Sequence, residues 1–199
     1  MSVPEKRGVS PSLAPLSGRT IAVFGSSEPL PGSELYCQAR EIGRLLGLAR
    51  ARVVNGGYGG VMEAASRGAH EVGGAAIGVT CALFGNRTPN EWLSETMPAR
   101  DLFDRTRLLI DLADAFIILP GKSGTIAELA FVWALDRAGA LGEKPLVLCG
   151  GSWRRLLDVL ERIGALEDEQ RRLTGFAETP ELAVIEVARR MAMPPSRGR

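Results

Sequence analysis

Histidine is almost absent from this chain, and cysteine is scarce. The 199 residues include one histidine, His70, and three cysteines. A single imidazole cannot build a cluster of histidine metal ligands, and it leaves a Ser-His-Asp triad with only one possible base. An odd number of widely spaced cysteines does not indicate a disulfide framework. We therefore expect free thiols, a reducing cytoplasmic location and no metal site.

The chain also lacks long apolar runs and an excess of charge of either sign. No segment reaches the length of a membrane span, and residues 1–18 contain no apolar core of a signal peptide. The 24 basic and 23 acidic residues give a net charge of +1, which offers no strongly positive surface to nucleic acids or anionic membranes. Neither a nucleic acid nor a membrane is therefore an expected partner.

Lysine is rare too, and its positions bear on cofactor chemistry. The three lysines are Lys6, Lys122 and Lys144. A pyridoxal-phosphate enzyme needs a Schiff-base lysine with an acidic partner for the pyridinium nitrogen. Lys6 lies near the N-terminus and Lys144 directly precedes an apolar run, so only Lys122 stands near a predicted phosphate site. We expect no pyridoxal-phosphate chemistry.

The length and composition predict one domain with short tails. A chain of 199 residues can bury one sizeable core but is short for two. Residues 1–18 are rich in proline, serine and charge, which predicts a flexible N-terminal tail, and residues 194–199 predict a short C-terminal tail. The domain is expected over residues 19–193.

Apolar runs alternate with amphipathic segments along this domain. Strands are predicted over residues 20–24, 52–54, 75–79, 115–119 and 145–149, with a sixth short strand over 174–178. Helices are predicted over residues 33–48, 61–72, 101–112, 125–138, 153–163 and 180–191, and residues 81–100 as a long irregular connection. This alternation predicts βαβ crossovers and a doubly wound parallel sheet in a Rossmann-like three-layer α/β/α fold.

Glycine- and serine-rich turns follow three of the predicted strands. In doubly wound sheets, ligands bind beyond the carboxyl ends of the strands, so these turns are expected to meet at one ligand site. The candidate binding residues are Gly25, Ser26, Ser27, Gly56, Gly57, Gly59, Gly60, Gly121, Lys122, Ser123, Gly124 and Thr125. Their spacing does not match G-x-G-x-x-G, which disfavours a redox dinucleotide, and no cofactor is expected.

The turn after the strand over 115–119 carries the clearest chemical signal. The apolar run breaks at Pro120-Gly121 and passes into a helix, whose unpaired first amides suit an anion such as phosphate. Glu128 follows in that helix and adds a carboxylate beside the predicted cradle. The same residues also fit a capping box, in which Thr125 and Glu128 satisfy each other's backbone amides.

Together these residues resemble the LONELY GUY family of cytokinin riboside 5′-monophosphate phosphoribohydrolases. The family pattern Pro-Gly-Gly-x-Gly-Thr-x-x-Glu appears here over residues 120–128, and the family's arginine corresponds to Arg105. The segments over residues 23–27 and 56–63 resemble the family's first two loops. The similarity extends from about residue 18 to residue 190.

The resemblance implies cleavage of the N-glycosidic bond of a nucleoside 5′-monophosphate, of the AMP or cytokinin riboside class, without a cofactor. It implies that Glu128 stabilises the oxocarbenium-like transition state and orients water, with the helix dipole favouring its ionised form. Arg105 would hold the nucleotide, the departing base or Glu128 itself. Without the resemblance, Arg105 reads as a solvated residue on a charged helix face. The resemblance also implies a homodimer, formed by the apolar faces of the helices over 101–112 and 125–138.

Three positions depart from the family pattern. Lys122 replaces a glycine, where it would be strained if φ is positive or would contact the phosphate directly. Thr106 stands where a lysine is common, and Glu63 adds a second carboxylate near the ligand. A non-catalytic carrier of a phosphorylated ligand, either a nucleotide or a molybdenum-pterin cofactor, is therefore an alternative. A regulatory nucleotide sensor is a third possibility.

Overall fold

The computed structural model describes residues 12–85 and 87–193. The outer parts of both predicted tails, residues 1–11 and 194–199, lie outside the described residues. Residues 12–18, which were also expected to be tail, instead pack on the domain. They include a short 3₁₀ helix, η1 (Ala14–Leu16), and the Leu16 side chain is fully buried.

A seven-stranded parallel sheet forms the centre of the domain, with strand order β4-β3-β2-β1-β5-β6-β7. The strands are β1 (Thr20–Phe24), β2 (Arg52–Asn55), β3 (Ala76–Cys81), β4 (Glu95–Ala99), β5 (Ala115–Ile118), β6 (Leu146–Cys149) and β7 (Thr174–Ala177). This arrangement confirms the predicted doubly wound α/β fold.

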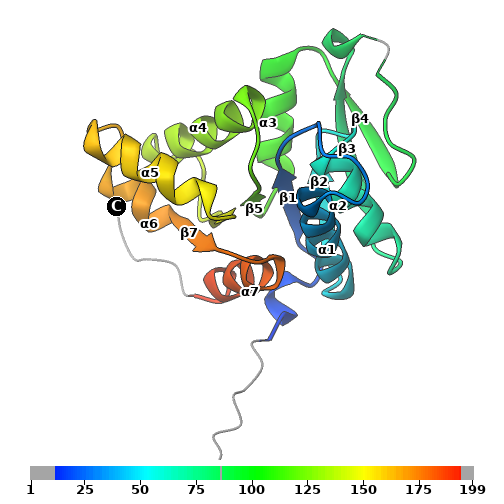
Figure 1. The fold of residues 1–199 in the computed structure, drawn as a ribbon, viewed down its shortest axis with the longest axis horizontal. Coiled ribbons are helices and arrows are strands. Elements are labelled where there is room, and N and C mark those ends of the chain that lie inside the picture. Colours follow the sequence, from blue (N-terminus) through cyan, green and yellow to red (C-terminus); the bar gives the residue numbers. More distant parts are fainter. Residues whose placement is uncertain (1–11, 86, 194–199) are drawn as a thin grey trace, which may run out of the picture.

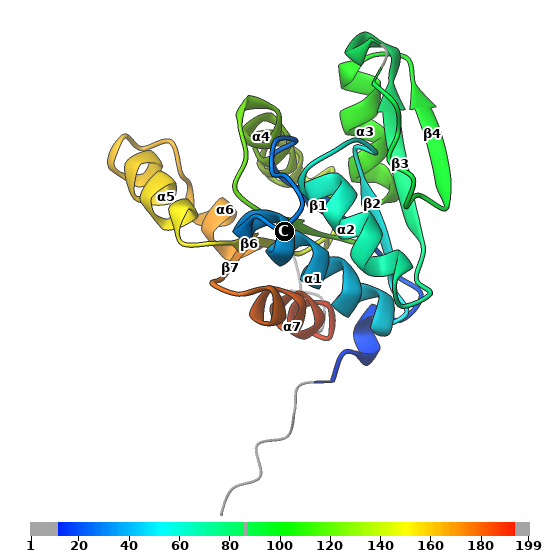
Figure 2. The same cartoon turned by 45° about the vertical axis from the view of Figure 1, so that its right-hand side comes forward.

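Helices cover both faces of the sheet. They are α1 (Glu34–Leu48), α2 (Val61–His70), α3 (Leu102–Leu112), α4 (Ser123–Arg137), α5 (Ser152–Arg162), α6 (Asp168–Leu173) and α7 (Pro180–Met191), with a second 3₁₀ helix, η2 (Ala82–Phe84). Figures 1 and 2 show α1, α2 and α7 on one face, and α3 and α4 on the other.

The core consists of two layers separated by the sheet, because side chains alternate along each strand. In β1, Ile21 and Val23 pack with α1, α2 and α7, whereas Ala22 and Phe24 pack with α3, α4 and α5. All five side chains of β1 are buried. Strands buried on both faces read as continuous apolar runs, which is why the central strands were predictable.

Three elements beyond β3 were missed in the sequence. The predicted irregular connection over 81–100 contains η2 and β4, and α6 forms between α5 and β7. Strand β4 pairs only with β3 and lies at the sheet edge, where its residues Glu95, Thr96 and Pro98 are mostly exposed. An edge strand does not need an apolar pattern. A proline is tolerated there because its missing N–H group removes no hydrogen bond on the side that has no neighbouring strand.

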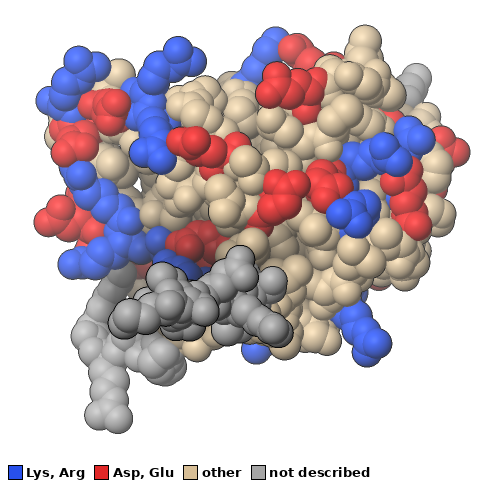
Figure 3. All heavy atoms as spheres, turned by 60° about the horizontal axis from the view of Figure 1, so that its bottom comes forward, with Lys and Arg blue, Asp and Glu red and all other residues tan. Residues whose placement is uncertain are grey.

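Acidic and basic side chains are interspersed over the face that carries α1 and α7 (Figure 3). The part of this face that the described residues leave visible presents no broad patch of one sign. None of the helices within residues 12–85 and 87–193 is both long and apolar enough to cross a membrane.

Helices α1 and α2 approach each other closely at two glycines. A Cβ atom added at Gly68 would lie 1.9 Å from the Arg40 carbonyl oxygen, and one added at Gly43 would lie 2.0 Å from the Ala65 carbonyl oxygen. Both neighbours are backbone atoms, so the clash could be relieved only by moving a whole helix. This crossing holds α2, and the turn that precedes it, against the sheet.

We expect Gly68→Ala to lower the free energy of unfolding by about 1–3 kcal/mol, the usual cost of overpacking. Urea denaturation followed by circular dichroism measures the change. Gly124→Ala is the control, because a Cβ there meets nothing within 4 Å, and it should leave the stability unchanged or slightly raised. Equal stability of Gly68→Ala and the wild type would show that the two helices can separate at little cost.

Candidate functional site

The three glycine- and serine-rich turns meet where the strand order reverses. Strand β1 lies between β2 and β5, and the chain winds outward in both directions from this point. The Ser26 amide donates to the Pro120 carbonyl oxygen at 3.1 Å, and the Val61 amide donates to the Ser26 carbonyl oxygen at 2.9 Å. These bonds tie the turns after β1, β2 and β5 together at the switch point, where ligands bind in this fold class.

A pocket of about 150 Å³ opens between these turns. It is lined by Gly25, Ser26, Ser27, Tyr58, Met62, Phe84, Arg87, Arg105, Lys122, Gly124, Thr125 and Glu128. Eight of these residues were candidates from the sequence. The candidates Gly56, Gly57, Gly59, Gly60, Gly121 and Ser123 do not line it. Ligand pockets usually begin near 300 Å³, so a nucleotide would fill this pocket and extend over its mouth.

Helix α4 points its N-terminus into the pocket. The helix begins at Ser123, two residues earlier than predicted, and its first backbone bond runs from the Ile126 amide to the Lys122 carbonyl oxygen at 3.0 Å. The amides of Ser123, Gly124 and Thr125 therefore lack partners within the helix. Their unpaired amides and the helix dipole suit an anion.

The capping-box interpretation is wrong for this helix. Lys122 occupies the cap position, no side chain caps the helix, and Thr125 is already its third residue. Gly121 lies against Thr125 instead, since a Cβ added at Gly121 would fall 2.1 Å from the Thr125 hydroxyl. Glu128 is consequently free to face the pocket rather than its own helix start.

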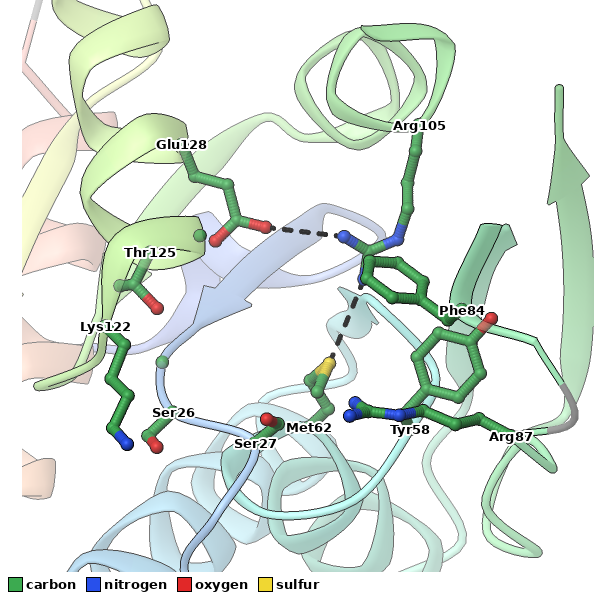
Figure 4. A pocket seen from close by; sticks show the side chains of 12 residues that line it. Ser26, Ser27, Tyr58, Met62, Phe84, Arg87, Arg105, Lys122, Thr125 and Glu128 are labelled. Carbon is green, nitrogen blue, oxygen red and sulfur yellow. Dashed lines mark hydrogen bonds and ion pairs between the residues drawn. The ribbon is translucent and has the colours of Figure 1, made fainter. Parts of the chain in front are cut away.

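Glu128 and Arg105 point toward each other across the pocket, from α4 and α3 (Figure 4). The Glu128 Oε1 lies 3.8 Å from the Arg105 Nη1, and the two side chains are only 13% and 10% exposed. Burial raises the pKa of Glu128 to about 7, and the charge of Arg105 limits the rise. The helix dipole was expected to favour the ionised form, but Glu128 lies in the second turn, where loss of hydration dominates.

Arg105 is a buried arginine whose position is set by backbone and aromatic contacts. Its Nε donates to the Val79 carbonyl oxygen at 2.8 Å, and its guanidinium lies 5.3 Å from the centre of the Phe84 ring. The expectation of a solvated residue on a charged helix face is therefore wrong. Arg107 fills that role, with ion pairs to Asp104 and Asp111 at 2.8 and 3.6 Å.

A glycine makes room for this guanidinium. A Cβ atom added at Gly56 would lie only 1.6 Å from the Arg105 Nη2. The glycines of this turn thus provide space for the arginine, whereas Tyr58 of the same turn lines the pocket. Helix α3 is held in place by the Asp101 side chain, which accepts from the Asp104 amide at 2.8 Å and caps the helix one residue before it begins.

The wall opposite the α4 N-terminus was missed in the sequence. Phe84 packs edge-on against Tyr58 with ring centres 5.5 Å apart, and the Arg87 guanidinium lies 5.9 Å from the Phe84 ring centre. The Tyr58 hydroxyl donates to the Cys81 carbonyl oxygen and accepts from the Cys81 amide, each at 3.0 Å. Tyr58 stands inside a glycine-rich turn, which was a usable signal. Phe84 and Arg87 lie in the connection that no motif marks.

The three departures from the family pattern have distinct structural outcomes. Lys122 has a φ of −98°, so the strain considered for that position is absent, and its Nζ bonds the Glu28 Oε1 at 2.5 Å beside the pocket. Glu63 does not line the pocket and accepts from the Tyr36 hydroxyl at 2.8 Å. Thr106 donates to the Leu102 carbonyl oxygen in its own helix.

A larger hollow of about 420 Å³ lies between α5, α6 and β7. It lies away from the switch point, and two of its four charged side chains, Arg171 and Glu161, already pair with each other at 2.6 Å. Within the part of the chain that the structure describes, no group of three His, Cys, Asp or Glu side chains is placed to hold a metal ion. The pocket at the switch point is therefore the candidate site.

Comparison with known proteins supports this choice. The model of a family described as SLOG cluster4 matches residues 18–152, which include every residue lining the pocket. A rice protein (Oryza sativa subsp. japonica) named "Probable cytokinin riboside 5′-monophosphate phosphoribohydrolase LOG4" is 33% identical over 72% of this chain. The match spans 64% of the rice protein, which is less than two thirds of its length.

A bacterial relative and a solved structure extend the comparison. The cytokinin riboside 5′-monophosphate phosphoribohydrolase of Rhodococcoides fascians is 31% identical over 72% of this chain and 74% of its own length. The molybdenum cofactor binding protein of Rippkaea orientalis superposes with a TM-score of 0.68, covering 88% of this chain and 98% of that chain. Its sequence identity is 21%, so this likeness concerns the fold.

The raised pKa of Glu128 predicts a pH-dependent stability. Between pH 4.5 and about 7 the folded protein keeps a proton on Glu128 that the unfolded chain has lost, so stability falls as the pH rises through this window. Relative to Glu128→Gln, we expect the wild type to lose about 3 kcal/mol of unfolding free energy between pH 4.5 and pH 8. Denaturation of both proteins at several pH values measures this difference. A constant difference would mean that Glu128 titrates normally.

Proposed function

The chain belongs to the SLOG cluster4 family, and we propose that it is a hydrolase of nucleoside 5′-monophosphates. The products would be the free base and ribose 5-phosphate. The observation that carries this proposal is the shared pocket: the buried Glu128–Arg105 pair faces the same space as the free amides of α4. The relatives named as phosphoribohydrolases support it, with identities of 33% and 31%.

The 5′-phosphate occupies the N-terminal end of α4 in this proposal. The amides of Ser123, Gly124 and Thr125 would donate to its oxygens, with the hydroxyls of Ser26 and Thr125 as further donors. Lys122 adds a positive charge at the same end of the pocket. Its ammonium group would contact both the Glu28 carboxylate and the phosphate. This arrangement fixes one end of the nucleotide and leaves its sugar beside Glu128.

The pair at 105 and 128 would act on the glycosidic bond. As that bond breaks, its electron pair leaves with the base and positive charge develops on the sugar C1′, which the Glu128 carboxylate stabilises. A water oxygen then bonds to C1′, and the proton that the water loses is balanced by the proton that the departing base gains. A pKa of about 7 lets Glu128 be ionised in a large fraction of molecules near neutral pH.

Arg105 would keep the carboxylate in position and counter the charge of the leaving base. Its Nε donates to the Val79 carbonyl oxygen, and this bond fixes the orientation of the guanidinium and of its remaining N–H groups. Since a guanidinium stays charged at all relevant pH values, the pocket retains this positive charge while Glu128 titrates.

We further propose that the protein acts as a homodimer in the cytoplasm. Large apolar side chains are exposed on α3 and α4, among them Phe103 at 77% and Phe131 at 41% exposure. Figures 1 and 2 place both helices on the same face of the sheet. Exposed apolar groups of this size favour association with another subunit. Cys81 and Cys149 are buried as free thiols, which fits a reducing compartment.

Purified protein incubated with a panel of nucleoside 5′-monophosphates should release free base, which chromatography detects. Glu128→Gln should reduce the turnover number by at least about 100-fold, because a neutral amide cannot stabilise the positive sugar, while nucleotide affinity stays within a few fold. Arg105→Ala should also reduce turnover and should remain folded, as checked by circular dichroism.

This experiment distinguishes a hydrolase from a non-catalytic carrier of a phosphorylated ligand. Binding without release of base by the wild type would contradict the hydrolase and favour the carrier of a phosphorylated ligand. In that case Glu128→Gln would leave the affinity for the ligand nearly unchanged. Unimpaired turnover by Glu128→Gln would remove the carboxylate from the mechanism.

Analytical ultracentrifugation tests the dimer. The wild type should sediment at twice the monomer mass at micromolar concentration, and Phe103→Glu combined with Phe131→Glu should shift it toward the monomer, because charge replaces the apolar contact. Ile163→Glu is the matched control, since Ile163 is also an exposed apolar residue, 68% accessible, but follows α5. A wild type that sediments as a monomer would contradict the proposal.

A further inference from the structure

The pocket has two chemically different ends with the reactive pair between them. Lys122, Ser26 and Thr125 stand at the α4 end, and Tyr58, Phe84 and Arg87 stand at the opposite end, with Glu128 and Arg105 between them in the view of Figure 4. If the phosphate occupies the α4 end and the sugar C1′ lies at Glu128, the base must lie toward Phe84. This placement rests on the proposed function.

Among the residues that the structure describes, the base end offers hydrogen-bond donors but no strong acceptor. The Tyr58 hydroxyl is already engaged with both the amide and the carbonyl oxygen of Cys81. Phe84 has no polar group, and among the described residues that line the pocket no carboxylate or side-chain amide lies at this end. Among the described residues that line the pocket, the charged donors that remain for a base are the guanidinium of Arg87 and the free N–H groups of Arg105.

Arg87 is positioned for this role and has no competing partner among the residues that the structure describes. Its guanidinium lies 5.9 Å from the Phe84 ring centre, and it makes no hydrogen bond or ion pair with residues 12–85 or 88–193. Contact with the ring orients the planar guanidinium while its five donors stay available. Arg105, in contrast, is held by Val79 and Glu128.

We propose that Arg87 is a specificity-determining residue that selects nucleotides with a 6-oxopurine base, as in IMP and GMP, over the 6-aminopurine of AMP. A guanidinium donates to two acceptors at once, and the 6-oxopurines present two neighbouring acceptors, O6 and N7. Adenine presents one acceptor, N7, beside the N6 amino donor, and a guanidinium cannot accept from it. The same mismatch applies to the N6-substituted adenine of a cytokinin riboside.

The test compares IMP with AMP, which share the sugar and phosphate and differ only at the six-membered ring of the base. The ratio of kcat/KM for IMP to that for AMP should be roughly 5- to 100-fold in the wild type, the range of a bidentate arginine contact. Arg87→Ala should bring the ratio close to 1. Arg87→Lys keeps the charge and donates without accepting, but it loses the planar two-donor geometry, so it should keep a reduced preference for IMP.

Arg87→Gln gives the sharpest result, because a glutamine amide both donates and accepts and so matches the N7 and N6 of adenine. This variant should reverse the preference and cleave AMP more efficiently than the wild type does. Loss of folding cannot produce such a gain. Arg154→Ala is the matched control: Arg154 lies 4.2 Å from the Phe176 ring centre, outside the pocket, and its removal should leave the ratio unchanged.

The proposed selectivity and the proposed reaction fail in different ways. Cleavage of AMP as fast as IMP by the wild type would overturn the role of Arg87 and leave the hydrolase intact. A preference for IMP that persists in Arg87→Ala would also overturn it. If no monophosphate is cleaved, the hydrolase fails, and the dissociation constants of IMP and AMP from calorimetry then decide the selectivity. Equal constants would overturn it, and tighter IMP binding that Arg87→Ala abolishes would support it.

Discussion

The site depends on one ion pair that is nearly withdrawn from water. A buried carboxylate loses its hydration, and Glu128 regains only part of that energy from Arg105 at 3.8 Å. Removing one partner of such a pair typically costs about 3–5 kcal/mol, because the other charge is then left alone in a medium of low polarity. The surrounding structure therefore has to keep both groups at fixed positions, and several features of the fold do so.

These features come from distant parts of the chain. The pair joins α3 to α4, the Val79 carbonyl oxygen of β3 anchors the arginine, and Gly56 after β2 leaves space for it. The reversal of strand order brings the loops after β1 and β5 together. The close crossing of α1 and α2 holds the glycine-rich turn after β2 against these two loops. The doubly wound sheet thus brings the site residues together, and glycines such as Gly56 leave space for the charged side chains.

The sequence predicts the central sheet well because β1, β5 and β6 are buried on both faces and read as apolar runs. It also predicts the glycine-containing turn that leads from β5 into α4, because its glycines and helix start are local features. It fails for β4, an exposed edge strand, and for the wall of Phe84 and Arg87, which only the packing of a distant connection brings to the pocket. Arg105 was picked out as a site residue only through the family resemblance, since its neighbours Asp104 and Arg107 make the segment look like a solvated helix face, and its burial was not predicted.

The anchor of Arg105 has a consequence for sequence drift. The acceptor is a main-chain carbonyl of Val79, and every amino acid carries that group. Evolution can therefore exchange the side chain at position 79 for any apolar one that fills the same layer of the core without disturbing the arginine. Among relatives, an interaction of this kind leaves no correlated substitutions, and it would be invisible to methods that infer contacts from paired changes in sequence.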